Sequence, residues 1–133
     1  MTSSIQLQSL TRRFGRATAL DGVTVSIPEN SICGLLGRNG AGKTTLMSLL
    51  SGQDCPTSGR VEVLGAAPFE NERVLSRVVF VRDNQRYPEG YRLRHVLRIA
   101  PQFAPAWSDE VAAELVAGFR LPERTPVKKF SRG

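Results

Sequence analysis

Three stretches of the chain alternate between apolar and polar side chains, as strands with one buried face do. They cover residues 5–10, 17–27 and 60–64, and a turn is expected over residues 11–16. Asp21-Gly22 interrupts the second stretch with residues that are typical of a bulge or a turn. The pattern therefore predicts three short strands before about residue 65.

Two further runs are apolar without alternation, and apolar residues recur at helical spacing in three places. The runs at 32–36 and 78–81 are consistent with fully buried strands. Helices are expected after Gly42, over 93–100, and after Ser108, which is a good N-cap. Gly52 is expected to end the first helix. The apolar positions of these helices are Leu46, Leu49, Leu50, Leu93, Val96, Leu97, Ala100, Ala112, Leu115, Val116 and Phe119.

The stretch Gly37-Arg38-Asn39-Gly40-Ala41-Gly42-Lys43-Thr44-Thr45 lies between the first apolar run and the first expected helix. Glycines lack Cβ, so the backbone can adopt a positive φ and approach a phosphate closely. Its N–H groups and the helix N-terminus would then face the anion. Lys43 would reach the β- and γ-phosphates, and the Thr44 hydroxyl would ligate Mg²⁺. This order of elements predicts a phosphate-binding loop; the alternative is a glycine-rich turn with a solvated lysine.

The charge balance allows some partners without requiring them. The 133 residues suit one domain or part of one. They include 18 Lys and Arg against 12 Asp and Glu, a net charge of +6. Nucleic acid or anionic lipid would suit such a chain, but scattered charges favour a basic surface on an anion-binding protein. Arg92, Arg94 and Arg98 are expected on a solvated helix face, with a partner or lipid headgroups as the alternative.

Several residues are expected to have no chemical role. Cys33 and Cys55 suggest neither a disulfide nor a metal site, so a reducing cytosol is the expected setting. No run approaches the ~18 apolar residues of a membrane span, and the first residues do not resemble a signal peptide. The only histidine, His95, is expected at the surface without a partner. Trp107 is expected to pack within the helical part, with a partner contact as the alternative.

Together the motifs resemble the N-terminal part of an ATP-binding-cassette (ABC) ATPase domain. Besides the phosphate loop, Arg13-Phe14-Gly15 followed by Ala19–Val23 resembles the family's adenine-stacking loop and the strand after it. Pro56-Thr57-Ser58-Gly59 resembles the turn after the first helix, and Phe80–Gln85 resembles the Q-loop region. Phe130-Ser131-Arg132-Gly133 resembles the start of the signature motif, usually Leu-Ser-Gly-Gly-Gln. The phosphate loop is shared with many NTPases, but this combination is specific to the family.

The resemblance implies an α/β, P-loop NTPase fold. A RecA-like core with an antiparallel β subdomain would be joined to the start of a helical subdomain, with much of the core's parallel sheet missing. The ATP-binding core would cover residues 1–90 and the helical subdomain 91–133. Phe14 would stack on adenine, with a core contact as the alternative. The phosphate loop would bind the phosphates, and Ser131 and Gly133 would contact nucleotide across a subunit interface.

The Q-loop departs from the family's pattern. Alignment from the preceding strand places Asp83 where the family has glutamine, and Gln85 lies two residues later. Either oxygen donor could contact Mg²⁺ and the attacking water, and both could instead be solvated loop residues. The family's Walker B strand, catalytic glutamate and switch histidine would lie beyond Gly133. The 133-residue chain alone is therefore expected not to turn over ATP.

The implied function is that of the ATP-binding subunit of an ABC transporter, which binds ATP with Mg²⁺ and hydrolyses it in the complete protein. The implied partners are a transmembrane permease subunit and a second ATP-binding subunit, with no nucleic acid. The implied location is the cytoplasm, at the inner face of the cell membrane. The alternatives are a non-transport ABC ATPase acting in translation or on DNA, and a nucleotide-binding module without turnover.

Overall fold

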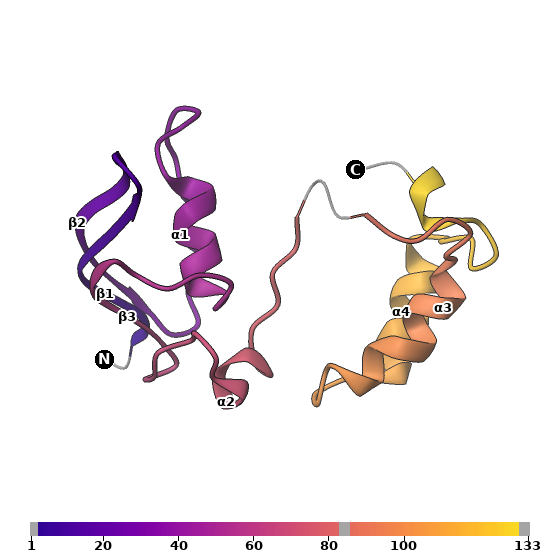
Figure 1. Cartoon of the computed structure of the whole chain (residues 1–133). Coiled ribbons are helices and arrows are strands. Elements are labelled where there is room, and N and C mark those ends of the chain that lie inside the picture. The colour runs from indigo at the N-terminus through magenta and orange to yellow at the C-terminus, as the bar shows by residue number, and fades with distance from the viewer. Residues whose placement is uncertain (1–2, 83–85, 131–133) are drawn as a thin grey trace. The chain divides into compact units, whose positions relative to one another are not determined.

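A computed structural model describes residues 3–82 and 86–130 of the chain (Figure 1). The chain forms two compact units, Met1–Phe80 and Val81–Gly133. The first unit is built on a three-stranded antiparallel sheet with the strand order β2-β1-β3. Its strands are β1 (Ser3–Phe14), β2 (Ala17–Pro28) and β3 (Ser58–Val63). The alternating stretches thus predicted all three strands.

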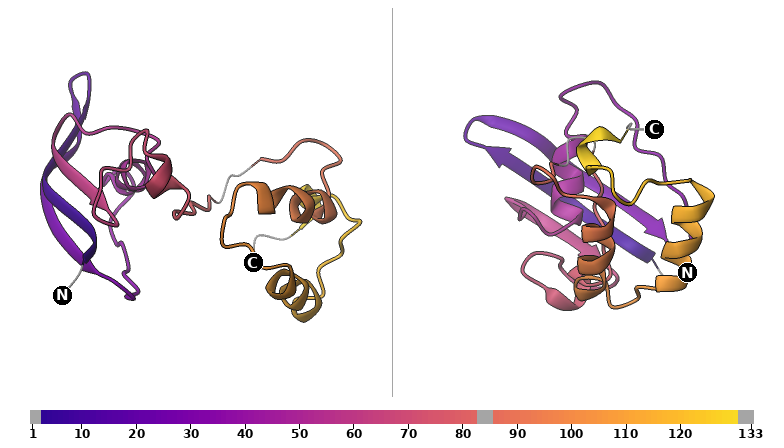
Figure 2. Two further views of the ribbon diagram at one scale, coloured as in Figure 1. Left: turned by 90° about the horizontal axis from the view of Figure 1, so that it is seen from below. Right: turned by 90° about the vertical axis from the view of Figure 1, so that its right-hand side faces the viewer.

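The hairpin between β1 and β2 is tighter than the sequence predicted. The turn expected over residues 11–16 is confined to Gly15 and Arg16, because β1 continues to Phe14, which pairs with Ala17. The predicted bulge is present: the register shifts at Asp21-Gly22, where Gly22 has a φ of +59°. Such a bulge bends a strand and increases its twist, and Figure 2 shows the curvature of this hairpin.

A helix covers one face of this sheet and creates the core. Helix α1 (Lys43–Leu50) packs Leu46, Leu49 and Leu50 against the sheet, as predicted. Burying a leucine side chain contributes roughly 1.5–3 kcal/mol, so these contacts fix the position of α1 and of the loop before it. Gly52 ends the helix as predicted, with a φ of +66° and its N–H donating to the Leu49 carbonyl. The buried members of the core cluster are Leu7, Leu10, Leu20, Leu49 and Val61.

The two uninterrupted apolar runs do not form the buried strands that the sequence predicted. Residues 32–36 and 78–81 lie outside every strand of the described chain. Ile32 and Leu36 are almost fully exposed, and so is Val79. A strand satisfies its backbone groups by pairing with a neighbour, and the sheet of the described chain includes neither run. The prediction of buried strands at these two runs is therefore wrong for the described chain, because apolar composition alone does not supply a neighbouring strand.

The second unit consists of short helices. They are α3 (Leu93–Ile99), η1 (Ala100–Gln102), α4 (Asp109–Gly118) and η2 (Val127–Lys129). The remaining short helix, α2 (Glu72–Leu75), belongs to the first unit. Ser108 caps α4 as predicted, its hydroxyl accepting the Val111 N–H at 3.2 Å. None of the described residues of this unit is fully buried.

The apolar face predicted for α4 is only partly correct. Ala112 and Val116 are half-buried, whereas Leu115 and Phe119 are exposed. The indole N–H of Trp107 donates to the Asp109 carboxylate at 2.8 Å, and Trp107 lines a groove of about 490 Å³ in this unit. Ala112 and Val116 line the same groove, so this face of α4 is only partly covered by the described residues of the unit.

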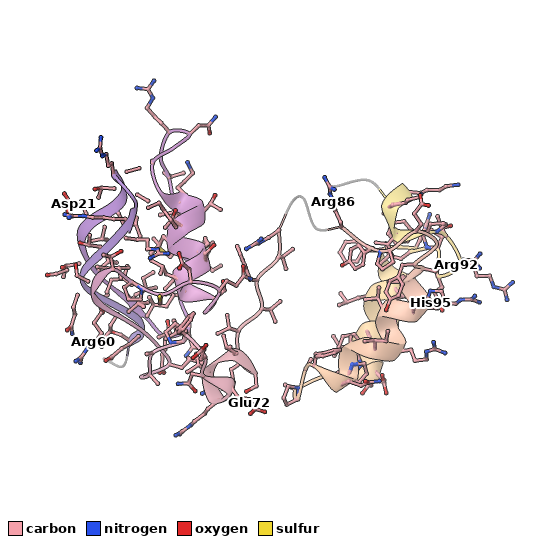
Figure 3. The ribbon with its side chains drawn as sticks, viewed as in Figure 1. Asp21, Arg60, Glu72, Arg86, Arg92 and His95 are labelled. Atoms are coloured by element: carbon pink, nitrogen blue, oxygen red, sulfur yellow. The ribbon has the colours of Figure 1, made fainter. Side chains whose placement is uncertain are left out.

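His95 has partners, so the expectation of an isolated surface histidine is wrong (Figure 3). It is half-buried, its Nδ1 accepts the backbone N–H of Arg92 at 3.0 Å, and its ring centroid lies 5.4 Å from that of Tyr91. Burial, followed by the positive charges of Arg94, Arg98 and Arg92, lowers the pKa of His95 from its ordinary value of 6.5. Protonation would both remove the acceptor for Arg92 and add a fourth positive charge.

A pH dependence follows for the helical unit. Because the folded-state pKa of His95 is lowered, its contribution to stability should be fully present above about pH 6.5 and lost as the pH falls through the lowered pKa. His95 is the only histidine, so an NMR titration of its ring measures this pKa directly. Thermal melts of His95→Asn, which can accept the same N–H without titrating, should lack this pH dependence. A titration midpoint at or above that of a free histidine would contradict the prediction.

Candidate functional site

The predicted phosphate loop leads directly into α1. Gly40 and Gly42 have φ values of +84° and +87°, which are conformations that favour glycine. The Ala41 N–H donates to the Arg38 carbonyl at 3.1 Å and closes a turn within the loop. The helix begins at Lys43, immediately after this turn. The loop and helix are therefore as the sequence predicted, while the strand expected before them is not formed.

Gly42 lies against the backbone of β2. A Cβ atom at this position would lie 2.3 Å from the carbonyl oxygen of Ala19 and 2.9 Å from a methyl group of Leu20. Only glycine therefore fits without a shift of the backbone. Since Leu20 belongs to the core, this contact joins the loop to the core of the sheet.

The loop and the start of α1 surround a pocket of about 290 Å³. Its lining residues include one lysine, Lys43, and two threonines, Thr44 and Thr45, and none of them carries a carboxylate. An array of donors at a helix N-terminus favours an anion. The lining residues are Ala19, Asn39, Gly40, Ala41, Gly42, Lys43, Thr44 and Thr45.

Lys43 lies across the loop that precedes it. Its Nζ donates to the carbonyl of Gly37 at 2.5 Å and to that of Arg38 at 2.8 Å. These carbonyls are neutral acceptors, and a hydrogen bond from the ammonium to a phosphate oxygen is stronger because the acceptor is then charged as well. The ammonium is thus already beside the loop at which a phosphate would bind.

The residues at the pocket also suit Mg²⁺. The ion takes oxygen ligands and is commonly bound through one or two protein groups together with substrate phosphates and water. Thr44 is exposed at the start of α1 and lines the pocket, so its hydroxyl fits this role. The described residues contain no cluster of three His, Cys, Asp or Glu side chains that could hold a metal without phosphate.

Phe14 stands at the end of β1, where the hairpin turns. The residue is 50% exposed, so it is not a buried core contact. The guanidinium carbon of Arg12 lies 4.5 Å from the ring centroid, in the geometry of a cation–π contact. Phe14 pairs with Ala17, two residues before the Ala19 that contacts Gly42. The same hairpin thus carries an accessible aromatic ring and one wall of the pocket.

The remaining predicted site residues lie outside the described part of the chain. They are Asp83, Gln85, Ser131 and Gly133. Two residues beside the site were not identified from the sequence: Ala19, which contacts Gly42, and Arg12, which contacts the ring of Phe14. Ala19 is a small residue in an alternating strand. Arg12 is bound by Asp54, which lies 42 positions later in the chain, too far for a local pattern to connect the two. Cys33 and Cys55 are free and exposed, although Cys33 was expected in a buried strand.

The loop, its lysine and threonine, and the helix that follows define a P-loop nucleotide-binding protein. A family model described as "ABC transporter" matches residues 20–133. The chain belongs to this family, the ABC ATPases. Within the described residues, no helix combines the length and apolar character needed to cross a bilayer.

Curated relatives support this assignment. The bacitracin transport ATP-binding protein BcrA of Bacillus licheniformis is 38% identical over 100% of this chain and 44% of its own length. The sulfate/thiosulfate import ATP-binding protein CysA of Bradyrhizobium diazoefficiens is 30% identical over 97% of the chain and 32% of its own length. The energy-dependent translational throttle protein EttA of Haemophilus influenzae is 49% identical, but over 43% of the chain and 10% of its own length. The chain thus spans less than half of each relative.

Solved structures confirm the fold class. An ATP-binding subunit of an ABC transporter has a TM-score of 0.83 and 22% identity, over 98% of this chain and 57% of that one. A nucleotide-free ATP-binding cassette from an ABC transporter has a TM-score of 0.73 and 20% identity, over 98% and 60% of the two chains. The chain is therefore part of a P-loop NTPase domain of the ABC type.

Proposed function

We propose that this chain is the nucleotide-binding part of an ATP-binding subunit that drives an ABC transporter. The observation that carries the proposal is the donor-rich pocket formed by the phosphate loop, α1 and β2. The match to a bacitracin transport ATP-binding protein over the whole chain supports the transport role. The partners would be a transmembrane permease subunit and a second ATP-binding subunit, at the cytoplasmic face of the membrane.

Different residues would bind different parts of MgATP. Lys43 and the loop N–H groups would bind the phosphates, and the Thr44 hydroxyl would hold Mg²⁺, which neutralises charge on the phosphates when bound. Phe14 would stack on adenine. Asp83 or Gln85 would act as the Q-loop residue beside the metal and the attacking water. Residues 1–90 would form the ATP-binding core and 91–133 the helical subdomain, with Ser131 and Gly133 closing the site of a second subunit.

A role in translation is the second candidate, because EttA is 49% identical over 57 residues. That match covers 10% of EttA, whereas the match to BcrA includes the whole chain. Fractionation of native cells separates the two functions. We expect the complete protein in the membrane fraction, released by detergent together with an integral membrane protein. Cosedimentation with ribosomes, lost in Lys43→Ala cells, would support the translational role and contradict transport.

The 133-residue polypeptide is expected to bind MgATP without steady-state hydrolysis. Hydrolysis needs a group that orients and polarises the attacking water, and no carboxylate lines the described pocket. Phosphate release should therefore equal that of a Lys43→Ala control, while calorimetry detects tighter ATP binding to the parent polypeptide than to the control. Sustained release that Lys43→Ala abolishes would contradict this, and would assign the missing role to a carboxylate such as Asp83 or Glu89.

A further inference from the structure

The ring of Phe14 is supported by an ion pair that brings together distant parts of the first unit. The Arg12 guanidinium donates from Nε to one oxygen of Asp54 at 2.8 Å, and its Nη2 lies 2.7 Å from the other. The side chains of Arg12 and Asp54 are 20% and 21% exposed. A two-bond fork of this kind fixes the plane of the guanidinium. Partial burial also protects the pair from screening by salt.

The geometry places this fixed guanidinium over one face of an aromatic ring. Arg12 and Phe14 are two residues apart on β1, so their side chains leave the same face of the strand. The guanidinium carbon lies 4.5 Å from the ring centroid. One face of the ring is therefore covered by Arg12, while Phe14 as a residue remains 50% exposed.

Asp54 lies in the segment that connects α1 to β3, residues 51–57. The same segment also binds the backbone on both sides of Arg12. The Arg13 N–H donates to the Thr57 hydroxyl at 3.0 Å, and the Thr57 N–H donates to the Thr11 carbonyl at 2.9 Å. Asp54 and Thr57 thus hold the side chain of Arg12 and the backbone on both sides of it. This connection follows α1, whose first residue is Lys43, so the ring and the phosphate loop are attached to one helix.

We propose that Arg12 and Asp54 are positioning residues for base recognition. Asp54 orients Arg12, and Arg12 covers one face of Phe14 so that the opposite face is presented to a flat, electron-rich heterocycle. A cation on one face of a ring withdraws electron density and favours stacking of an electron-rich base on the other. This inference rests on the proposed binding of ATP and on Phe14 as the base platform. It predicts a contribution to base affinity and none to phosphate affinity.

The test compares MgATP with magnesium tripolyphosphate by calorimetry on the full chain. We expect Arg12→Gln and Asp54→Asn to weaken ATP binding by about three- to tenfold and to leave tripolyphosphate binding unchanged. Arg12→Lys keeps the charge but not the planar fork of the guanidinium, so its affinity for ATP should lie between that of these two variants and that of the parent chain. Arg60→Gln is the matched control, because Arg60 pairs with Glu62 on β3 away from the ring. It should change neither affinity.

A double-mutant cycle separates positioning from a general effect on folding. If Arg12 acts through the ring, Arg12→Gln should add no further loss of ATP affinity in a Phe14→Ala background. Parallel losses for ATP and tripolyphosphate, or additive losses in the cycle, would overturn the positioning role. If Arg12→Gln does not fold, Arg12→Lys supplies the same cycle.

The outcomes also distinguish this inference from the function on which it rests. ATP affinity lowered by Phe14→Ala but unchanged by Arg12→Gln would overturn the role of Arg12 alone. ATP and tripolyphosphate binding unaffected by Phe14→Ala would overturn the base platform itself. Binding of neither ligand by the folded parent chain would overturn the proposed nucleotide site.

Discussion

Replacing Lys43 by alanine is expected to weaken the binding of ATP and of tripolyphosphate equally, by about ten- to a hundredfold. A charge-assisted hydrogen bond to phosphate contributes roughly 1.5–3 kcal/mol, and 1.4 kcal/mol corresponds to a factor of ten. The Lys43 ammonium already lies at the loop, bonded to the carbonyls of Gly37 and Arg38. Calorimetric titration with both ligands in the presence of Mg²⁺ measures the loss.

The matched control for Lys43 is Lys129→Ala. Lys129 is an exposed lysine at the end of η2 and does not line the pocket, so its removal makes the same change in net charge without altering a lining residue. Thermal melts of both variants show whether the loss of the two carbonyl bonds unfolds the loop. Unchanged ligand affinity in a folded Lys43→Ala variant would show that the phosphates bind elsewhere.

The features that the sequence predicted well depend on a few neighbouring residues. Gly52 ends α1 because glycine readily adopts the positive φ that follows a helix. Ser108 caps α4 because its hydroxyl reaches an N–H three residues later. The phosphate loop belongs to the same class, since its positive φ values and its position before a helix are encoded within one short stretch. Local chemistry of this kind can be read without knowing the rest of the fold.

The features that the sequence predicted poorly depend on partners. Residues 32–36 are as apolar as a buried strand should be, but strand formation needs a neighbour that the described residues do not provide. The contact of Arg12 with Asp54 spans 42 positions along the chain, so only folding brings them together. His95 is an intermediate case. It stands three residues after Arg92, at the position from which a Glu or Gln side chain commonly accepts the N-cap N–H, and this local signal could have identified its role.

A still larger effect is expected from Gly42→Ala, because the change combines backbone strain with a collision. An L-residue with a φ near +87° costs roughly 1–2 kcal/mol. The new Cβ would also lie 2.3 Å from the Ala19 carbonyl oxygen, and overpacking typically costs a further 1–3 kcal/mol. The free energy of unfolding of an ordinary domain is about 5–15 kcal/mol, so these costs are a large part of it. We therefore expect a marked loss of stability and no measurable binding of ATP or tripolyphosphate.

Gly65→Ala separates the two causes. Gly65 has a φ of +82°, but a Cβ there meets nothing within 4 Å, so this variant carries the strain without the collision. Urea unfolding should give a distinctly lower midpoint for Gly42→Ala than for Gly65→Ala, and only the former should lose ligand binding. Equal midpoints would mean that the loop moves away from β2 at little cost. The contact between Gly42 and Ala19 would then be incidental, and the hairpin that carries Phe14 would not be held against the phosphate loop.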